Sequence, residues 1–69
     1  MEMIFQALRL QYEAEISKAK ANIQVYIENP AGIGEHPDLV EAVNHELSKL
    51  ATAEDKLASL QSNYSEYSN

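Results

Sequence analysis

Few residues of this 69-residue chain could carry out catalysis or hold a metal, and their spacing is poor. There is no cysteine to act as a nucleophile or a thiolate ligand. His36 and His45 are nine residues apart, so they do not share one face of a helix. Glu41 and His45 have the i, i+4 spacing of a ligand pair, but polar neighbours make a solvated pair the simpler interpretation. The sequence therefore predicts no catalytic residue, no metal site and no cofactor, and a protein that is not an enzyme.

The charge balance argues against nucleic acid as a partner. The formal net charge is −6, and the five lysines and arginines are spread along the chain instead of forming a basic face that could neutralise phosphates. No apolar run approaches the ~20 residues that cross a membrane. Glu2 stands where a secretory signal would carry basic residues. These features predict an acidic cytoplasmic protein.

The strongest break in the chain lies at residues 29–36. Both glycines and both prolines fall in or next to this stretch, as Pro30, Gly32, Gly34 and Pro37. Pro30 should end a helix at or before Asn29, and Pro37 suits the first position of the next helix. The break therefore predicts a turn between two helices, with Asp38 in the opening turn of the second.

Residues 2–28 contain no glycine or proline and are expected to form one helix with two apolar stripes. In the broad stripe Phe5, Tyr12, Ala19 and Tyr26 recur every seven residues, the spacing of a coiled-coil seam. The broad stripe also contains Ile4, Leu8, Ile16, Ile23 and Ile27. The second stripe lies on nearly the opposite side and consists of Met3, Ala7, Leu10, Ala14, Ala21 and Val25. A partner helix in the same chain can cover one stripe, so the second stripe predicts an interface between subunits.

Residues 37–62 are expected to form the second helix. One apolar row in this helix has a seven-residue repeat and consists of Val43, Leu50, Leu57 and Tyr64. Further apolar positions flank the row: Val40 and Leu47 on one side, and Leu39, Ala53 and Leu60 on the other. The polar residues 63–69 are expected to fray. Tyr64 continues the row, whereas Tyr67 does not and is interpreted as disordered or as a partner contact.

The fold class that follows is all-α. Residues 1–69 should form a single domain, an antiparallel two-helix hairpin of coiled-coil type. Two hairpins that share their second stripes would make a four-helix bundle, and larger oligomers could use the same surfaces. A chain this short has difficulty burying enough apolar surface alone, which also favours a homo-oligomer.

The stretch 29–43, together with residues 53–57 and 19–23, resembles small uncharacterised helical-hairpin proteins of tailed bacteriophages. The resemblance extends over most of the chain. It implies a phage accessory protein made in the cytosol of an infected bacterium, and it does not choose a mechanism or name site residues.

Three functional hypotheses follow from these features. The first is a non-enzymatic, self-associating helical module that binds a host or phage protein. The second is an oligomeric sponge for a small signalling nucleotide in counter-defence, with a tyrosine stacked on the base and Lys18, Lys20 or Arg9 at the phosphates. The third is a structural or scaffold component. Candidate contacts for a partner or ligand are Tyr12, Tyr26, Ile33, His36 and Tyr64, although a plug over the open end of the hairpin is the simpler interpretation of Ile33.

Overall fold

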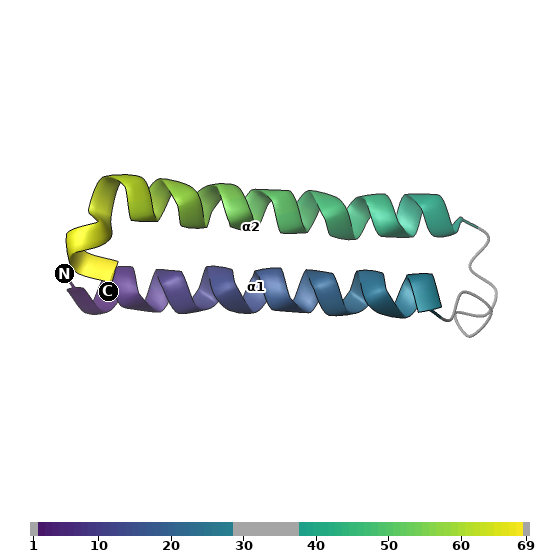
Figure 1. The fold of residues 1–69 in the computed structure, drawn as a ribbon, viewed down its shortest axis with the longest axis horizontal. Coiled ribbons are helices and arrows are strands. Elements are labelled where there is room, and N and C mark those ends of the chain that lie inside the picture. Colours follow the sequence, from purple (N-terminus) through teal and green to yellow (C-terminus); the bar gives the residue numbers. More distant parts are fainter. Residues whose placement is uncertain (1, 29–37, 69) are drawn as a thin grey trace.

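The computed structural model describes residues 2–28 and 38–68, and these form two antiparallel helices (Figure 1). Helix α1 spans Glu2–Glu28 and α2 spans Leu39–Ser68. They lie side by side along a rod of 46 × 14 × 14 Å. The predicted all-α hairpin is confirmed. The predicted turn at 29–36, with Ile33 and His36, lies outside the described residues, as does Pro37.

Helix α1 has the range expected from its uninterrupted run of helix-forming residues. Side chains one turn apart support it along the exposed surface. Arg9 Nη1 lies 3.1 Å from Glu13 Oε1, and the Gln24 amide donates a hydrogen bond to the Glu28 carboxylate. Such i, i+4 pairs each stabilise a helix by about 0.2–0.5 kcal/mol, so they assist the helix but do not decide its packing.

Helix α2 begins two residues later than expected, because Asp38 caps it instead of lying in its first turn. Asp38 Oδ1 accepts a hydrogen bond from the Glu41 backbone N–H at 2.8 Å, and the Asp38 carbonyl accepts one from the Ala42 N–H at 3.1 Å. The aspartate thereby satisfies one of the amides that a helix start leaves without a partner.

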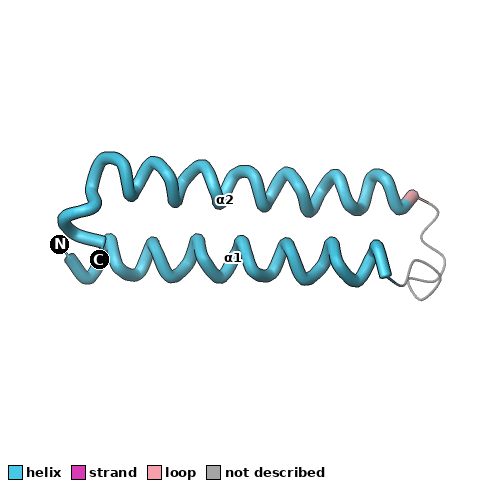
Figure 2. The backbone as a smooth tube through the Cα atoms, in the orientation of Figure 1, coloured by secondary structure: helices cyan, strands magenta, loops and turns pink. Residues whose placement is uncertain are grey.

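The C-terminal segment does not fray as predicted: α2 continues to Ser68 and bends at Tyr64, where φ is −135° and ψ is 29°. Figure 2 shows the last turn crossing toward the start of α1. There the Tyr64 and Tyr67 rings stack on Phe5, with centroid separations of 4.9 and 5.2 Å. We name Phe5, Tyr64 and Tyr67 the aromatic clasp. The interpretation of Tyr67 as disordered is wrong, because the bend at Tyr64 turns the end of α2 toward α1 and brings the Tyr67 ring onto Phe5. Its contact with a partner stays a prediction.

The core is a narrow strip along the seam between the helices. Ala19 and Ala53 are each only 2% exposed, and Leu60 is also buried. The larger inner residues are half-buried; on α1 these are Phe5, Leu8, Tyr12, Ile16, Ile23 and Tyr26, and on α2 Leu39, Val43, Leu50 and Leu57. Small side chains at Ala19 and Ala53 leave room for the two backbones to approach closely in the middle of the hairpin.

Five residues assigned to the inner stripes from the sequence are in fact exposed: Ile4 and Ile27 on α1, and Val40, Leu47 and Tyr64 on α2. One partner helix covers only the positions nearest the seam, so residues at the edge of a broad stripe stay in contact with water. The hairpin therefore hides less apolar surface than the helical wheel suggests.

Candidate functional site

The most prominent candidate surface is the second stripe of α1, which we call the outer face and which consists of Met3, Ala7, Leu10, Ala14, Ala21 and Val25. All six residues are exposed in the hairpin. The exposed fractions of the large ones are 81% for Met3, 54% for Leu10 and 56% for Val25. At 3.6 residues per turn this face is centred roughly 155° from the row Phe5–Tyr12–Ala19–Tyr26 that faces α2. Helix α2 therefore cannot cover both faces of α1.

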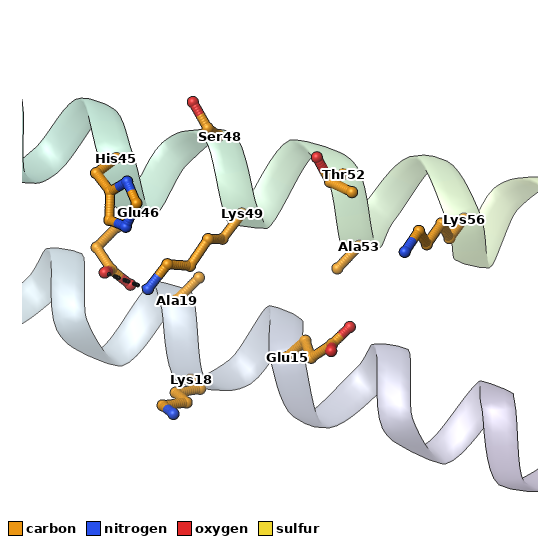
Figure 3. A pocket seen from close by; sticks show the side chains of 10 residues that line it. All are labelled: Glu15, Lys18, Ala19, His45, Glu46, Ser48, Lys49, Thr52, Ala53 and Lys56. Carbon is orange, nitrogen blue, oxygen red and sulfur yellow. Dashed lines mark hydrogen bonds and ion pairs between the residues drawn. The ribbon is translucent and has the colours of Figure 1, made fainter.

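A second candidate is a groove of about 420 Å³ along one side of the seam (Figure 3). Its floor contains the buried alanines Ala19 and Ala53. The residues around them come from both helices and are largely polar: Glu15 and Lys18 from α1, and His45, Glu46, Ser48, Lys49, Thr52 and Lys56 from α2. Three of the five cations of the chain thus line one groove of an acidic protein.

The lysines of the groove do not converge on one point. Lys49 extends toward α1, where its ammonium lies 3.0 Å from Glu46 Oε2. The Lys56 ammonium lies 5.9 Å from the centre of the Tyr12 ring, within the range of a cation–π contact. Lys18 points away from α2 (Figure 3). The groove is therefore mildly basic, and two of its cations already have partners within the chain.

The aromatic residues proposed to stack on a base are only partly brought together. Tyr12 and Tyr64 line one hollow of about 240 Å³ with Lys56, Ser59 and the side chains between them. Tyr26 is half-buried two seven-residue repeats further along α1, about 21 Å away along the helix axis. Of the cations predicted to meet phosphate, Lys18 lines the groove, whereas Arg9 is paired with Glu13 and Lys20 is exposed.

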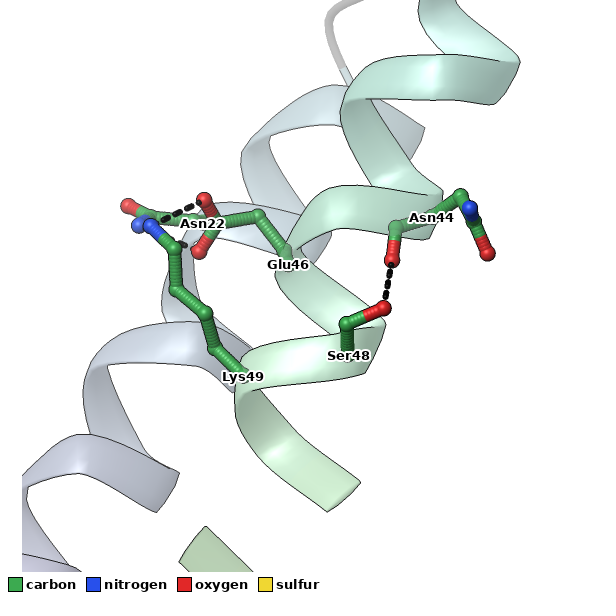
Figure 4. A network of polar contacts seen from close by, with 5 residues as sticks. All are labelled: Asn22, Asn44, Glu46, Ser48 and Lys49. Atoms are coloured by element: carbon green, nitrogen blue, oxygen red, sulfur yellow. Dashed lines mark hydrogen bonds and ion pairs between the residues drawn. The ribbon is translucent and has the colours of Figure 1, made fainter. Parts of the chain in front are cut away.

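A polar cluster interrupts the apolar seam next to the groove (Figure 4). Glu46 is 7% exposed and lies on the same seven-residue row as Leu39, Ala53 and Leu60. Asn22 Nδ2 of α1 donates a hydrogen bond to Glu46 Oε1 at 2.9 Å, and Lys49 Nζ donates to Glu46 Oε2 at 3.0 Å. Each carboxylate oxygen thus has its own donor, and among the described residues no buried side-chain oxygen or nitrogen lacks a partner.

This arrangement favours the charged form of Glu46. The Asn22 amide, followed by the Lys49 ammonium, holds the pKa of the Glu46 carboxyl below its ordinary value, because both donors stabilise the carboxylate more than burial disfavours it. The sequence signal for this cluster was the acidic residue in an otherwise apolar row. It was missed because Glu46 and Lys49 also have the spacing of an ordinary surface pair.

Over residues 2–28 and 38–68, no three histidine or acidic side chains gather to hold a metal ion. Glu41 and His45 are both exposed on α2. Neither helix within these ranges combines the length and the apolarity that crossing a membrane requires.

Comparison with known proteins returned no match to a family model, to a curated protein or to a solved structure.

Proposed function

We propose that this chain is a non-enzymatic, self-associating helical module that acts by binding protein, in the first place a second copy of itself through the outer face. The observation that carries the proposal is the exposure of Met3, Leu10 and Val25 along a face of α1 that α2 does not reach. Apolar residues that line up along a whole helix face, with polar residues on its flanks, mark contact surfaces more often than scattered exposed residues do.

The surface area of the hairpin supports the same proposal. The chain exposes 5114 Å². A compact monomer of this mass exposes about 4300 Å² according to the size scaling of folded proteins. The excess of about 800 Å² reflects the elongated rod of 46 × 14 × 14 Å, in which each helix is covered on one side only. Association through one long helix face would reduce this excess.

The test is the mass of the protein in solution. We expect light scattering at tens of micromolar to give a multiple of 7.7 kDa. Leu10→Glu should shift the mass to that of one chain, because a charged side chain cannot be buried in an apolar contact without a large desolvation penalty. Gln6→Glu is the matched control, since it adds the same charge one turn earlier but beside the outer face, and it should leave the mass unchanged.

The proposal fails if the wild-type protein is monomeric at these concentrations while circular dichroism shows full helicity. The proposal would also be contradicted if Gln6→Glu reduced the mass to that of one chain and Leu10→Glu did not. That result would place the contact elsewhere on α1.

The setting we propose follows the resemblance noted above: a phage accessory protein in the cytosol of an infected bacterium, bound to a host or phage protein. The acidic surface and the exposed residues Ile27, Val40 and Leu47 at the edges of the seam offer that partner a second contact area, apart from the outer face. A pull-down from infected cells should recover one partner in constant proportion to the wild-type protein. Recovery of the bait alone would contradict this part of the proposal.

Sequestration of a small signalling nucleotide remains the competing proposal, and the lysine-lined groove favours it. The net charge of −6 and the existing partners of Lys49 and Lys56 count against it. Mass spectrometry of material released from heat-denatured protein separates the two proposals. A stoichiometric nucleotide that is lost in Lys56→Gln would favour sequestration, whereas its absence from wild-type protein would exclude it.

A further inference from the structure

The outer face is arranged symmetrically about Ala14. Ala7 and Ala21 lie seven residues on either side of it, and Met3 and Val25 lie eleven residues on either side. Four residues on either side of Ala14 lie Leu10, which belongs to the outer face, and Lys18, which lies at its edge and is the one unlike partner in the row. At 100° per residue all seven positions fall within an arc of about 80°. In an antiparallel two-fold contact centred on Ala14, position i faces position 28 − i of the partner, so this row places alanine against alanine and Met3 against Val25.

We propose that two copies of this chain dock α1 against α1, antiparallel, with a two-fold axis passing between the two Ala14 residues. This inference rests on the proposed self-association and specifies its geometry. Ala14 then faces the partner's Ala14, Ala7 faces the partner's Ala21, and Met3 faces the partner's Val25. Each contact away from the axis occurs twice, as in any isologous interface.

The sizes of the side chains fit this geometry. Alanines at 7, 14 and 21 occupy the central part of the contact, where small side chains let two helix backbones approach closely. Met3 and Val25 close both ends with larger apolar groups. Leu10 lies opposite the aliphatic stem of the partner's Lys18, whose ammonium can reach water at the edge of the interface. Lys18 is exposed and points away from α2, as this role requires (Figure 3).

The geometry also determines the shape of the assembly. Because the outer face is roughly 155° from the inner face of α1, the order of helices across the dimer is α2, α1, the partner's α1 and the partner's α2. These four helices form a single layer and not the square arrangement of an ordinary four-helix bundle. A two-fold contact is also closed, so assembly stops at the dimer.

The chain contains no cysteine, so single introduced cysteines can map the contact without interference. The three variants are Ala7→Cys, Ala14→Cys and Ala21→Cys, and Ala51→Cys on the exposed surface of α2 is the control. Each is oxidised mildly at micromolar concentration, alone and in mixtures that have been unfolded and refolded together, and covalent dimers are measured on non-reducing gels. A disulfide requires Cα atoms within about 7 Å, so only facing positions react efficiently.

Antiparallel docking predicts that Ala14→Cys forms covalent dimers alone, at least tenfold more than Ala51→Cys. Ala7→Cys and Ala21→Cys should each form few covalent dimers alone. A mixture of the two variants should form them efficiently. A parallel contact would instead link Ala7→Cys and Ala21→Cys each to itself, which overturns the inference. If an alanine variant loses helicity, Met3→Cys mixed with Val25→Cys tests the same register at the ends of the contact.

Failure of this inference can be told from failure of the proposed function. If light scattering shows that the folded wild-type protein is a monomer, both the proposed self-association and the antiparallel geometry are contradicted. If the wild-type protein is a dimer of about twice 7.7 kDa but Ala14→Cys alone forms no covalent dimer, only the antiparallel geometry is contradicted. Small-angle X-ray scattering adds an independent measurement, because helices about 9 Å apart in one layer give a particle about 35–40 Å wide, nearly twice the width of a square bundle. The narrower particle would contradict the single layer.

Discussion

The inner and outer faces of α1 are both apolar, yet they differ in residue size, in spacing and in what covers them. The inner face carries large side chains in a seven-residue repeat, and α2 packs on it. The outer face carries three alanines among its six residues, with Met3 at one end and Val25 at the other, and all six are exposed. The inner contact forms within one chain and does not depend on protein concentration, whereas any contact on the outer face does. Helix α1 thus has one face that the hairpin covers and one that it leaves exposed.

The largest expected effect tests whether the seam supplies the stability of the hairpin. Leu60→Ala should lower the free energy of unfolding by about 2–5 kcal/mol, the usual range for truncating a buried leucine. Leu47→Ala removes the same atoms from an exposed position of α2 and should change stability by less than about 0.5 kcal/mol. Both are measured by chemical denaturation at low concentration. Equal effects of the two variants would mean that the seam is not the core.

The second prediction contrasts an alanine of each face. Ala19 is buried between the helices, so Ala19→Leu should overpack the seam and lower the free energy of unfolding by about 1–3 kcal/mol. Ala14→Leu should leave the unfolding of the hairpin unchanged, because Ala14 is exposed there. The same Ala14→Leu variant should weaken self-association, since it enlarges the residue at the proposed two-fold axis. Analytical ultracentrifugation and denaturation of both variants separate these effects.

A smaller effect is expected at the aromatic clasp. Tyr67→Ala should lower the free energy of unfolding by about 0.5–1.5 kcal/mol. This is what an aromatic pair contributes in addition to the burial of its surface. Tyr67→Phe keeps the ring and should behave like the wild type. Hydrogen exchange provides the local measurement: the amides of residues 61–67 should lose protection in Tyr67→Ala and keep it in Tyr67→Phe. Unchanged protection in both would show that the last turn is held by other contacts.

The smallest expected effect concerns Glu46 and depends on pH. Because the folded state lowers the pKa of Glu46, its contribution to stability is present above the ordinary glutamate pKa of about 4.3 and is lost as the pH falls through the lower folded value. Glu46→Gln should therefore reduce the loss of stability between about pH 5 and pH 3. Glu54→Gln removes an exposed carboxylate from the same helix and is the matched control. The denaturation midpoints of both variants are compared across this pH range. Identical pH profiles would contradict a stabilising role for the Glu46 carboxylate.

Much of the fold could be predicted from the sequence, because it depends on local chemistry. A run without glycine or proline predicts a helix, and Pro30 predicts its end. The candidate surface was predicted as well, since a stripe of small and apolar residues opposite a seven-residue seam cannot be covered by the same partner helix. Its role in self-association is a prediction that the solution experiments above will decide.

Other features could not be read from the helical wheel. Ile4, Ile27, Val40 and Leu47 were assigned to the inner stripes but are exposed, because the width of a stripe does not tell how far a single partner helix reaches. Tyr67 was separated from the seam because it lies off the row that ends at Tyr64, and no local pattern predicted the bend at Tyr64 that brings its ring onto Phe5.

The sequence by itself determined two helices, the break between them and two apolar faces on α1, since each of these follows from spacing and backbone preference along the chain. Only the tertiary structure decided that Glu46 is held inside the seam by Asn22, that Ala19 and Ala53 lie buried between the helices, and that the last turn closes on Phe5. These contacts join residues far apart in the sequence. Their formation depends on the register of one helix against the other, which no local pattern specifies.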